Sequence, residues 1–248
     1  MAVTEAVTEE VGRQTASGIG RGWSSYLVVL GGLLMLVDLY LVFMVAPTDA
    51  VLGHVQRVFY FHVPIAIMSF LAFFIVFIAS IGFLVKRNRR WDSVAHASAE
   101  VGVVFVTLAL LSGVIWARPV WGVWWTWEPR LTTTLILWLI YVAYLMLRSY
   151  APNKAQGALY AAAVGIVGFV DVPIVYYSVQ WWRSIHPAPV VGPLAEAGAL
   201  EPVMLWVLLF SFLTFLVLFL YLVAERVSLR NAEDRLTDLR FRLRRSGR

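Results

Sequence analysis

Long apolar stretches alternate with short polar connections along most of the 248 residues. Several of these stretches exceed about 18 residues, the length at which a membrane-spanning helix is expected. Backbone groups in lipid must find partners within the protein, and the stretches are too long for the strands of a membrane barrel. The pattern therefore predicts an all-α integral membrane protein with six transmembrane helices, at about residues 24–46, 61–85, 94–116, 131–147, 158–179 and 202–224.

Basic residues gather in alternate connections, and this sets the predicted orientation. Lysine and arginine are concentrated in residues 86–90, at Arg148 and Lys154, and in the tail. Six spans place all of these on one side of the membrane, and the positive-inside rule makes that side the cytoplasm. Both termini are then cytoplasmic. The remaining three connections face outward, at about residues 47–60, 118–130 and 180–201.

The spans divide the chain into three parts. Residues 1–22 form a cytoplasmic N-terminal segment, residues 23–224 the six-helix transmembrane domain, and residues 225–248 a basic cytoplasmic helix or tail. The first apolar stretch is long enough to span, so we do not expect a cleavable signal before it. The tail has leucines at heptad-like spacing, which fits either an amphipathic surface helix or a docking helix for a partner. These are Leu229, Leu236, Leu239 and Leu243.

Composition narrows the chemistry that the chain can perform. Charged residues make up 14% of the sequence, against about 25% in a typical soluble domain. The chain has no cysteine, which excludes disulfides, thiolate zinc sites, iron–sulfur clusters and thioether-linked haem. The net charge of +5 resides in the connections and the tail, so it sets topology and does not indicate nucleic-acid binding.

A tryptophan-rich run, residues 116–130, lies between the third and fourth spans. Five tryptophans fall in these fifteen residues, together with Pro119, Gly122 and Pro129. The prolines and the glycine argue against one unbroken helix, so the run is predicted to be an ordered loop or short helix at a membrane surface. An interfacial tryptophan belt explains one or two such residues but not five. A broad indole surface beside positive charges suits a flat, apolar, anionic ligand such as haem.

Two of the four histidines fall on the predicted outer face beside aromatic residues. His62 stands at the outer end of the second span and His186 lies in the last outward connection, whereas His54 lies in the first. His96 is at the cytoplasmic side, one turn from Glu100, and is interpreted as structural. Neutral imidazole is a common ligand of haem iron, so His62 and His186 are predicted to hold a bis-histidine haem. The alternative is that each is a polar cap at the interface.

The outward connections also contain arginines, which the positive-inside bias disfavours there. Arginine forms bidentate bonds with carboxylates, so two or more of these side chains could bind the haem propionates. Arg130 and Arg183 are the strongest candidates, followed by Arg118 and Arg57. The alternative is pairing with acidic residues of the same connections, namely Asp49, Glu128, Glu196 and Glu201.

Asp38 and Asp171 lie inside predicted spans, where an ionisable residue is costly and is a functional candidate. Asp171 precedes Pro173, so the fifth span is expected to kink there. The sequence leaves open whether either aspartate is structural or functional.

The segment Trp121–Thr132 (WGVWWTWEPRLT) resembles the tryptophan-rich WWD motif of haem-handling proteins in cytochrome c biogenesis. Six spans, one such run and one histidine in each flanking outward connection are similar to the CcmC family, over about residues 22–224. Related CcmF-like proteins are larger, and CcsA-like proteins have more spans and more histidines. This chain departs from the family pattern at Glu128, where Asp is usual, and at Asp171, where Asn is frequent.

The resemblance implies a haem-binding and haem-transfer protein, not an enzyme, in the bacterial inner membrane. Such a protein takes up haem b non-covalently and transiently at the periplasmic face and presents it to the haem chaperone CcmE. The ABC transporter subunits CcmA and CcmB and the small membrane protein CcmD assist. Carried over by position, His62 and His186 are the axial ligands, and haem and chaperone contact an indole platform formed by Trp121, Trp124, Trp125 and Trp127.

Two other classes of function remain open at this point. A b-type membrane oxidoreductase would need histidine pairs inside helices, usually for two haems, and only His96 lies near the inner side. A permease would need broken helices that meet at the midplane, and only the two intramembrane aspartates favour it.

Overall fold

The computed structural model describes residues 19–187, 189–190, 192–196 and 198–246, and these residues are predominantly helical. Six helical segments in this part of the chain, one of them formed by two consecutive α-helices, are long and apolar enough to cross a membrane, which confirms the predicted number of spans. The protein is therefore a multi-pass membrane protein. The elements are α2 (Ile19–Tyr40), η1 (Leu41–Val45), η2 (His54–Val58), α3 (Phe59–Lys86), α4 (Arg89–Trp121), α5 (Pro129–Tyr150), α6 (Lys154–Gly168), α7 (Asp171–Trp181) and α8 (Pro202–Ser246).

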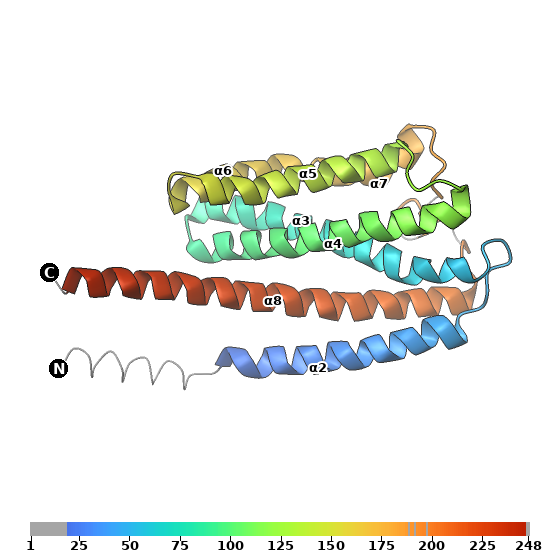
Figure 1. Ribbon diagram of the computed structural model, residues 1–248, viewed down its shortest axis with the longest axis horizontal. Coiled ribbons are helices and arrows are strands. Elements are labelled where there is room, and N and C mark those ends of the chain that lie inside the picture. Colours follow the sequence, from blue (N-terminus) through green and yellow to red (C-terminus); the bar gives the residue numbers. More distant parts are fainter. Residues whose placement is uncertain (1–18, 188, 191, 197, 247–248) are drawn as a thin grey trace.

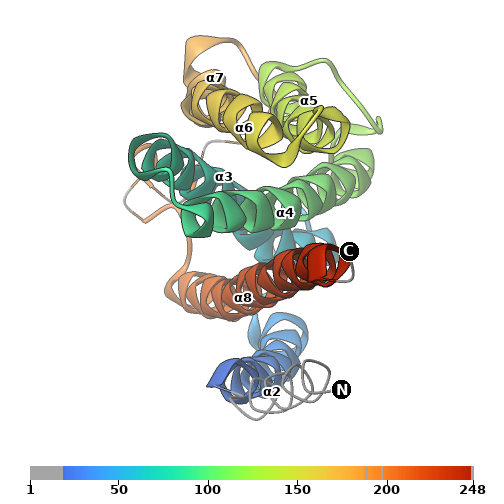
Figure 2. The same ribbon diagram turned by 90° about the vertical axis from the view of Figure 1, so that its left-hand side faces the viewer.

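The helices form layers that run nearly parallel to one long axis (Figure 1). Viewed along that axis, α5, α6 and α7 lie on one side of the α3–α4 pair, with α8 on the other side and α2 outermost (Figure 2). The packing agrees, since α2 contacts α8 and α8 contacts both α3 and α4. The start of α2 and the last turns of α8 lie at one end of the bundle, as an even number of spans requires (Figure 1). The connections α2–α3, α4–α5 and α7–α8 all lie at the opposite end, which we call the cavity end.

The tryptophan-rich run is divided between a helix and a loop. Helix α4 continues through Pro119 and ends only after Trp121, where Gly122 adopts φ 76°. The expectation that Pro119 helps to interrupt the helix is therefore wrong. A proline in the last turn removes a single backbone bond, and the glycine, which tolerates positive φ, ends the helix instead. Residues 122–128 form the connection, and α5 begins at Pro129, a favoured residue for the first helical position.

The fifth span consists of two helices, as Asp171 and Pro173 predict. Helix α6 ends at Gly168 and α7 begins at Asp171. Pro173 lies in the first turn of α7, where its missing N–H has no intrahelical acceptor to lose. The kink expected at this point is thus present as an interruption between two helices.

Asp38 joins the outermost helix to the bundle. Its side chain is buried, and its Oδ1 accepts a hydrogen bond of 2.7 Å from the hydroxyl of Ser211 on α8. This contact between α2 and α8 favours a structural role for the aspartate.

The end opposite the cavity, which we call the ion-paired end, is closed by carboxylate–arginine contacts. Arg148 of α5 donates two hydrogen bonds, of 2.6 and 2.7 Å, to Asp92 of α4. Arg226 of α8 makes the same bidentate contact with Glu100 of α4. His96 lies 3.5 Å from this Glu100 carboxylate, which agrees with its structural interpretation.

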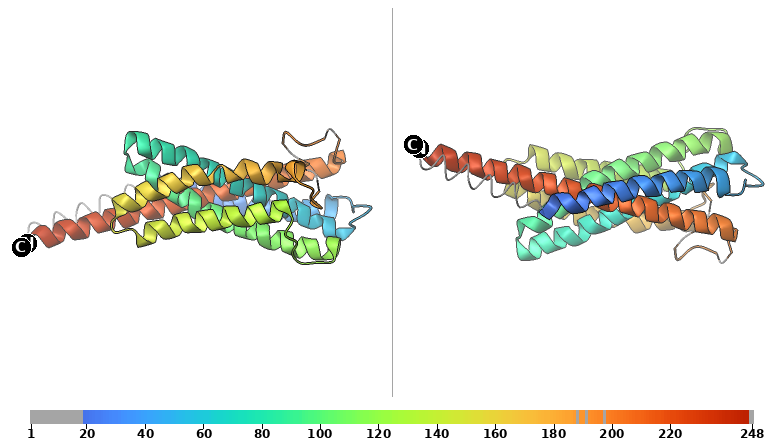
Figure 3. Two further views of the ribbon diagram at one scale, coloured as in Figure 1. Left: turned by 90° about the horizontal axis from the view of Figure 1, so that it is seen from above. Right: turned by 90° about the horizontal axis from the view of Figure 1, so that it is seen from below.

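Helix α8 crosses the predicted boundary at residues 224–225 without a break and extends beyond the other helices (Figure 3). Lys154 contacts Asp234 across 2.9 Å, so the first turns of the tail are joined to the bundle. The predicted leucine seam is exposed on this extension, at Leu229, Leu236, Leu239 and Leu243.

Candidate functional site

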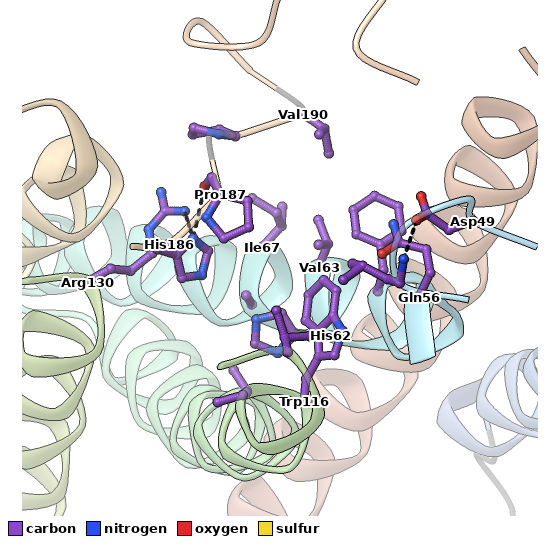
Figure 4. Close-up of a pocket in the computed structure, with 18 of the residues that line it drawn as sticks. Asp49, Gln56, His62, Val63, Ile67, Trp116, Arg130, His186, Pro187 and Val190 are labelled. Atoms are coloured by element: carbon purple, nitrogen blue, oxygen red, sulfur yellow. Dashed lines mark hydrogen bonds between the residues drawn. The ribbon is translucent and has the colours of Figure 1, made fainter. Parts of the chain in front are cut away.

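A cavity of about 730 Å³ lies at the cavity end, within the range of about 300–1,000 Å³ that is usual for small-molecule sites. Its walls come from the start of α3, the end of α4, the start of α5, α7 and the connection that precedes α8. In Figure 4, Arg130 and His186 lie on one side, Asp49 and Gln56 on the other, and His62 between them. The structure thus brings both predicted histidines into one cavity.

His62 is held by the facing helix α4. Its Nδ1 lies 2.9 Å from the Oγ of Ser112, whose hydroxyl donates to the Leu108 carbonyl across 2.7 Å. Because the Ser112 proton is already used, Ser112 accepts and the His62 proton resides on Nδ1. The Nε2 atom is then an unprotonated nitrogen that can bind a metal. The Trp116 ring contacts the imidazole edge to face, with centroids 5.8 Å apart.

His186 comes from the connection after α7 and has contacts to Pro187 and to α5. Its Nδ1 lies 3.0 Å from the carbonyl oxygen of Pro187 and 3.3 Å from Nη1 of Arg130. The shorter contact is to an acceptor, so we place the proton on Nδ1, which again leaves Nε2 free. The pKa of His186 is lowered to about 4, first by burial and then by the charge of Arg130, so the ring is neutral at pH 7.

Arg130 is the one predicted propionate partner that lines the cavity in the described part of the chain. Its Nη2 donates to the backbone carbonyl of Tyr176 across 3.0 Å, which fixes the guanidinium beside His186. Arg118 is exposed and donates to the carbonyl of Gly122, at the end of α4. Arg183 is also exposed, in the connection that contains His186. The structure therefore separates one half-buried arginine in the cavity from two exposed arginines.

The four predicted platform tryptophans occupy different environments. Trp121 lines the cavity, with its ring centroid 6.2 Å from that of His186. Trp124 and Trp127 are 57% and 74% exposed, so they are available to another molecule. Trp125 packs edge to face on Trp127, with centroids 5.5 Å apart. One indole therefore belongs to the cavity and three belong to the loop beside it.

Glu128 is buried beneath this loop and caps α5. Its Oε1 accepts a hydrogen bond of 2.7 Å from the backbone N–H of Leu131. Its Oε2 accepts from the hydroxyl of Ser184, in the connection that contains His186. Glu128 is not among the residues that line the cavity.

Comparisons with known proteins identify the family of this chain. Residues 12–242 match the family model described as "Heme exporter protein C". The chain belongs to the haem exporter protein C family. Curated relatives with this name include proteins from Bradyrhizobium diazoefficiens, 37% identical over 68% of this chain, and from Haemophilus influenzae, 35% identical over 74%. The matches cover 65% and 75% of the lengths of these two relatives. A relative from Escherichia coli is 33% identical over 70% of this chain and 69% of its own length.

Two serines beside the histidines, and the place of Trp116 in the cavity wall, escaped the sequence reasoning. Ser112 and Ser184 contact the two histidines, and Trp116 forms a wall beside His62. A signal existed for two of them, since residues 112 and 116 are one helical turn apart on the same face of α4. Ser184 had no such signal, because its partner Glu128 lies 56 residues away in the chain.

Proposed function

We propose that the cavity binds one haem b, non-covalently and transiently, for the maturation of c-type cytochromes. His62 and His186 supply the two axial ligands. The observation that carries this proposal is that both imidazoles line one cavity, with each Nδ1 engaged by the protein and each Nε2 free. Membership of the haem exporter protein C family points to the same cargo.

The residues present fit such a cargo. A porphyrin brings four nitrogen ligands of its own, so two protein ligands complete an octahedral iron. The described residues contain no group of three or more histidines or carboxylates that could hold a bare metal ion. Trp116 and Trp121 give the cavity apolar, π-rich walls suited to a macrocycle. Arg130 is the propionate partner inside the cavity, and the exposed Arg118 and Arg183 are candidates at its rim.

We place this site at the periplasmic face of a bacterial inner membrane, because the basic residues of the opposite end make that end cytoplasmic. The protein presents haem to the chaperone CcmE, with Trp124, Trp125 and Trp127 as the contact surface. CcmA and CcmB, an ABC transporter, and CcmD complete the assembly. In this scheme the protein is not an enzyme but supplies ligation and orientation.

An absorption spectrum of the detergent-purified protein, before and after haemin addition, tests the ligand pair. We expect a low-spin, six-coordinate spectrum in the wild type. His62→Ala and His186→Ala should each give a high-spin spectrum or lose haem. His54→Ala is the matched control, because this exposed histidine lies in η2, directly before α3, but does not line the cavity. A low-spin spectrum that survives both substitutions and disappears in His54→Ala would overturn the assignment.

Transfer to the chaperone tests the exposed indoles separately. The double variant Trp124→Ala/Trp127→Ala should keep the haem spectrum but lose haem transfer to CcmE. Trp206→Ala is the control, since Trp206 is 72% exposed on α8 and does not belong to the tryptophan-rich run. Equal loss of transfer in both proteins would show that the loop is not the contact surface.

A further inference from the structure

The buried carboxylate of Glu128 joins two segments that are distant in the sequence. One oxygen accepts from the Leu131 N–H and so caps the start of α5. The other accepts from the Ser184 hydroxyl, 56 residues further along the chain. A carboxylate has acceptor positions for both bonds, and each is charge-assisted and stronger than a neutral hydrogen bond. The connection after α7 is thereby attached to the first turn of α5.

Ser184 passes this attachment on to His186. Its hydroxyl proton goes to Glu128, and its Oγ accepts a hydrogen bond of 3.1 Å from the backbone N–H of His186. The serine oxygen is therefore fixed from one side by the carboxylate and fixes the histidine backbone on the other. His186 itself lies in a connection without regular helix, so its position depends on such contacts.

The first turn of α5 also places the Arg130 guanidinium beside the His186 ring. Arg130, two residues after Glu128, contacts the imidazole Nδ1 at 3.3 Å and the Tyr176 carbonyl at 3.0 Å. Glu128 thus fixes the backbone of His186 through Ser184, while Arg130 lies against its ring. Both residues belong to the start of α5, which Pro129 and the Glu128 cap stabilise, and the hydrogen-bonded restraint on His186 is the one through Ser184.

We propose that Glu128 and Ser184 are positioning residues, which hold His186 in the orientation needed for iron ligation, and that Glu128 does not itself contact haem. This inference deepens the proposed function and rests on it. The acidic residue at the end of the tryptophan-rich run then acts on the ligand histidine and not on the cargo or the chaperone. Groups that orient a metal ligand typically change affinity by about 10–100-fold when removed.

The test compares Glu128→Ala and Ser184→Ala with Ser184→Thr and Asn153→Ala. Ser184→Thr keeps the hydroxyl. Asn153→Ala removes an equivalent helix cap, since Asn153 accepts from the Gln156 N–H across 2.9 Å at the start of α6, far from the cavity. Haemin titration should show about 10–100-fold weaker binding and a high-spin component in Glu128→Ala and Ser184→Ala. Ser184→Thr and Asn153→Ala should match the wild type.

A second readout does not need haem. Modification of His186 by diethyl pyrocarbonate in the haem-free protein, followed on the His186 peptide by mass spectrometry, should be several-fold faster in Ser184→Ala than in wild type or Asn153→Ala. Ser184→Ala leaves the cap of α5 intact. If Glu128→Ala does not fold, Ser184→Ala by itself still tests the inference. Wild-type haem affinity, spectrum and labelling rate in Ser184→Ala would overturn the inference. If the wild type takes up no haem, the proposed function fails, and the labelling rate alone decides the positioning role.

Discussion

Helix α5 carries an arginine near each end, and the two have different partners. Arg130 and Arg148 are 18 residues apart (148 minus 130), which is about five turns, so they lie on the same face of the helix. Arg148 makes a bidentate contact with Asp92 at 2.6 and 2.7 Å. Arg130 contacts only a histidine nitrogen and a backbone carbonyl, and no carboxylate of the described residues lies within ion-pairing distance.

The comparison separates Arg148, which is paired within the protein, from Arg130, which has no carboxylate partner among the described residues. At the ion-paired end the buried Arg148 side chain already has its carboxylate, Asp92. At the cavity end Arg130 lines an open space and has no such partner among the described residues. A charge that is removed from water is normally paired, so this guanidinium suits a ligand with an anionic group. An anionic carboxylate of haem fits that requirement.

Arg148→Ala is expected to have the largest effect on folding. It leaves the Asp92 carboxylate without its partner at a site where the side chains are 7% and 18% exposed. Breaking such a pair costs about 3–5 kcal/mol of unfolding free energy. Denaturation in detergent measures this loss, while haem affinity of the folded fraction should not change. Replacing both partners should restore part of the stability, and a failure to do so would argue against the pair as the cause.

Arg130→Gln should show the opposite behaviour. It removes the charge at the cavity but strands no protein carboxylate, so stability should fall by less than in Arg148→Ala. Loss of a charge-assisted bond to a propionate is worth about 1.5–3 kcal/mol, which is roughly 10- to 150-fold in haem affinity. Haemin titration measures this loss of haem affinity. Wild-type haem affinity in Arg130→Gln would show that Arg130 does not bind a propionate.

Ser112→Ala tests the support of the other ligand. Without Ser112, the Nδ1–H of His62 loses its acceptor and the ring can rotate, so haem affinity should fall by about tenfold. Ser149→Ala is the matched control, because the Ser149 hydroxyl also bonds back to a carbonyl of its own helix, at the ion-paired end. Equal affinities of the two variants would show that His62 needs no such support.

Gly113→Ala should reduce haem binding by a few-fold without destabilising the protein. A Cβ at this position would lie 3.2 Å from Cε1 of His62, so the ring would have to shift. The helix itself gains about 0.5–1 kcal/mol from alanine in place of glycine. Gly32→Ala in α2 is the control, since its Cβ would meet nothing within 4 Å. Unaltered haem binding in both would mean that the His62 ring has room to move.

Lys154→Ala should have the smallest effect. The Lys154 side chain is 74% exposed in its contact with Asp234, and such surface pairs contribute about 0–1 kcal/mol. Thermal unfolding in detergent should barely change, and added salt should make the variant and the wild type indistinguishable. A loss as large as that of Arg148→Ala would mean that the tail of α8 stabilises the whole bundle.

The sequence predicted the two candidate ligand histidines at one end of the bundle, but not the contacts that orient them. Counting spans was enough to assign His62 and His186 to connections on the same side, because each apolar stretch reverses the direction of the chain. Contacts of His62 with Ser112 and of Glu128 with Ser184 join residues 50 and 56 positions apart. Such pairs depend on how each helix is rotated and displaced, and no local pattern specifies that.

In the tryptophan-rich run, too, the sequence predicted some features while the packing of the chain decided others. Its prolines and glycine indicated an interruption, yet only Gly122 ends α4, because Pro119 lies where one missing hydrogen bond costs little. The run predicted a common indole surface, and the fold places Trp121 in the cavity while Trp124 and Trp127 lie exposed. Burial of an indole depends on the element that packs over it, which here is the connection after α7.

Apolar length, charge distribution and turn residues determined by themselves that this chain forms six membrane helices with two histidines at one end. These properties are local, because lipid imposes the same length and the same backbone hydrogen bonding on every span. Only the tertiary structure decided that Asp92 pairs with Arg148, that Glu128 pairs with Ser184, and that Arg130 faces an open cavity. Each of these depends on the relative rotation of packed helices, and that rotation is fixed by the whole core together.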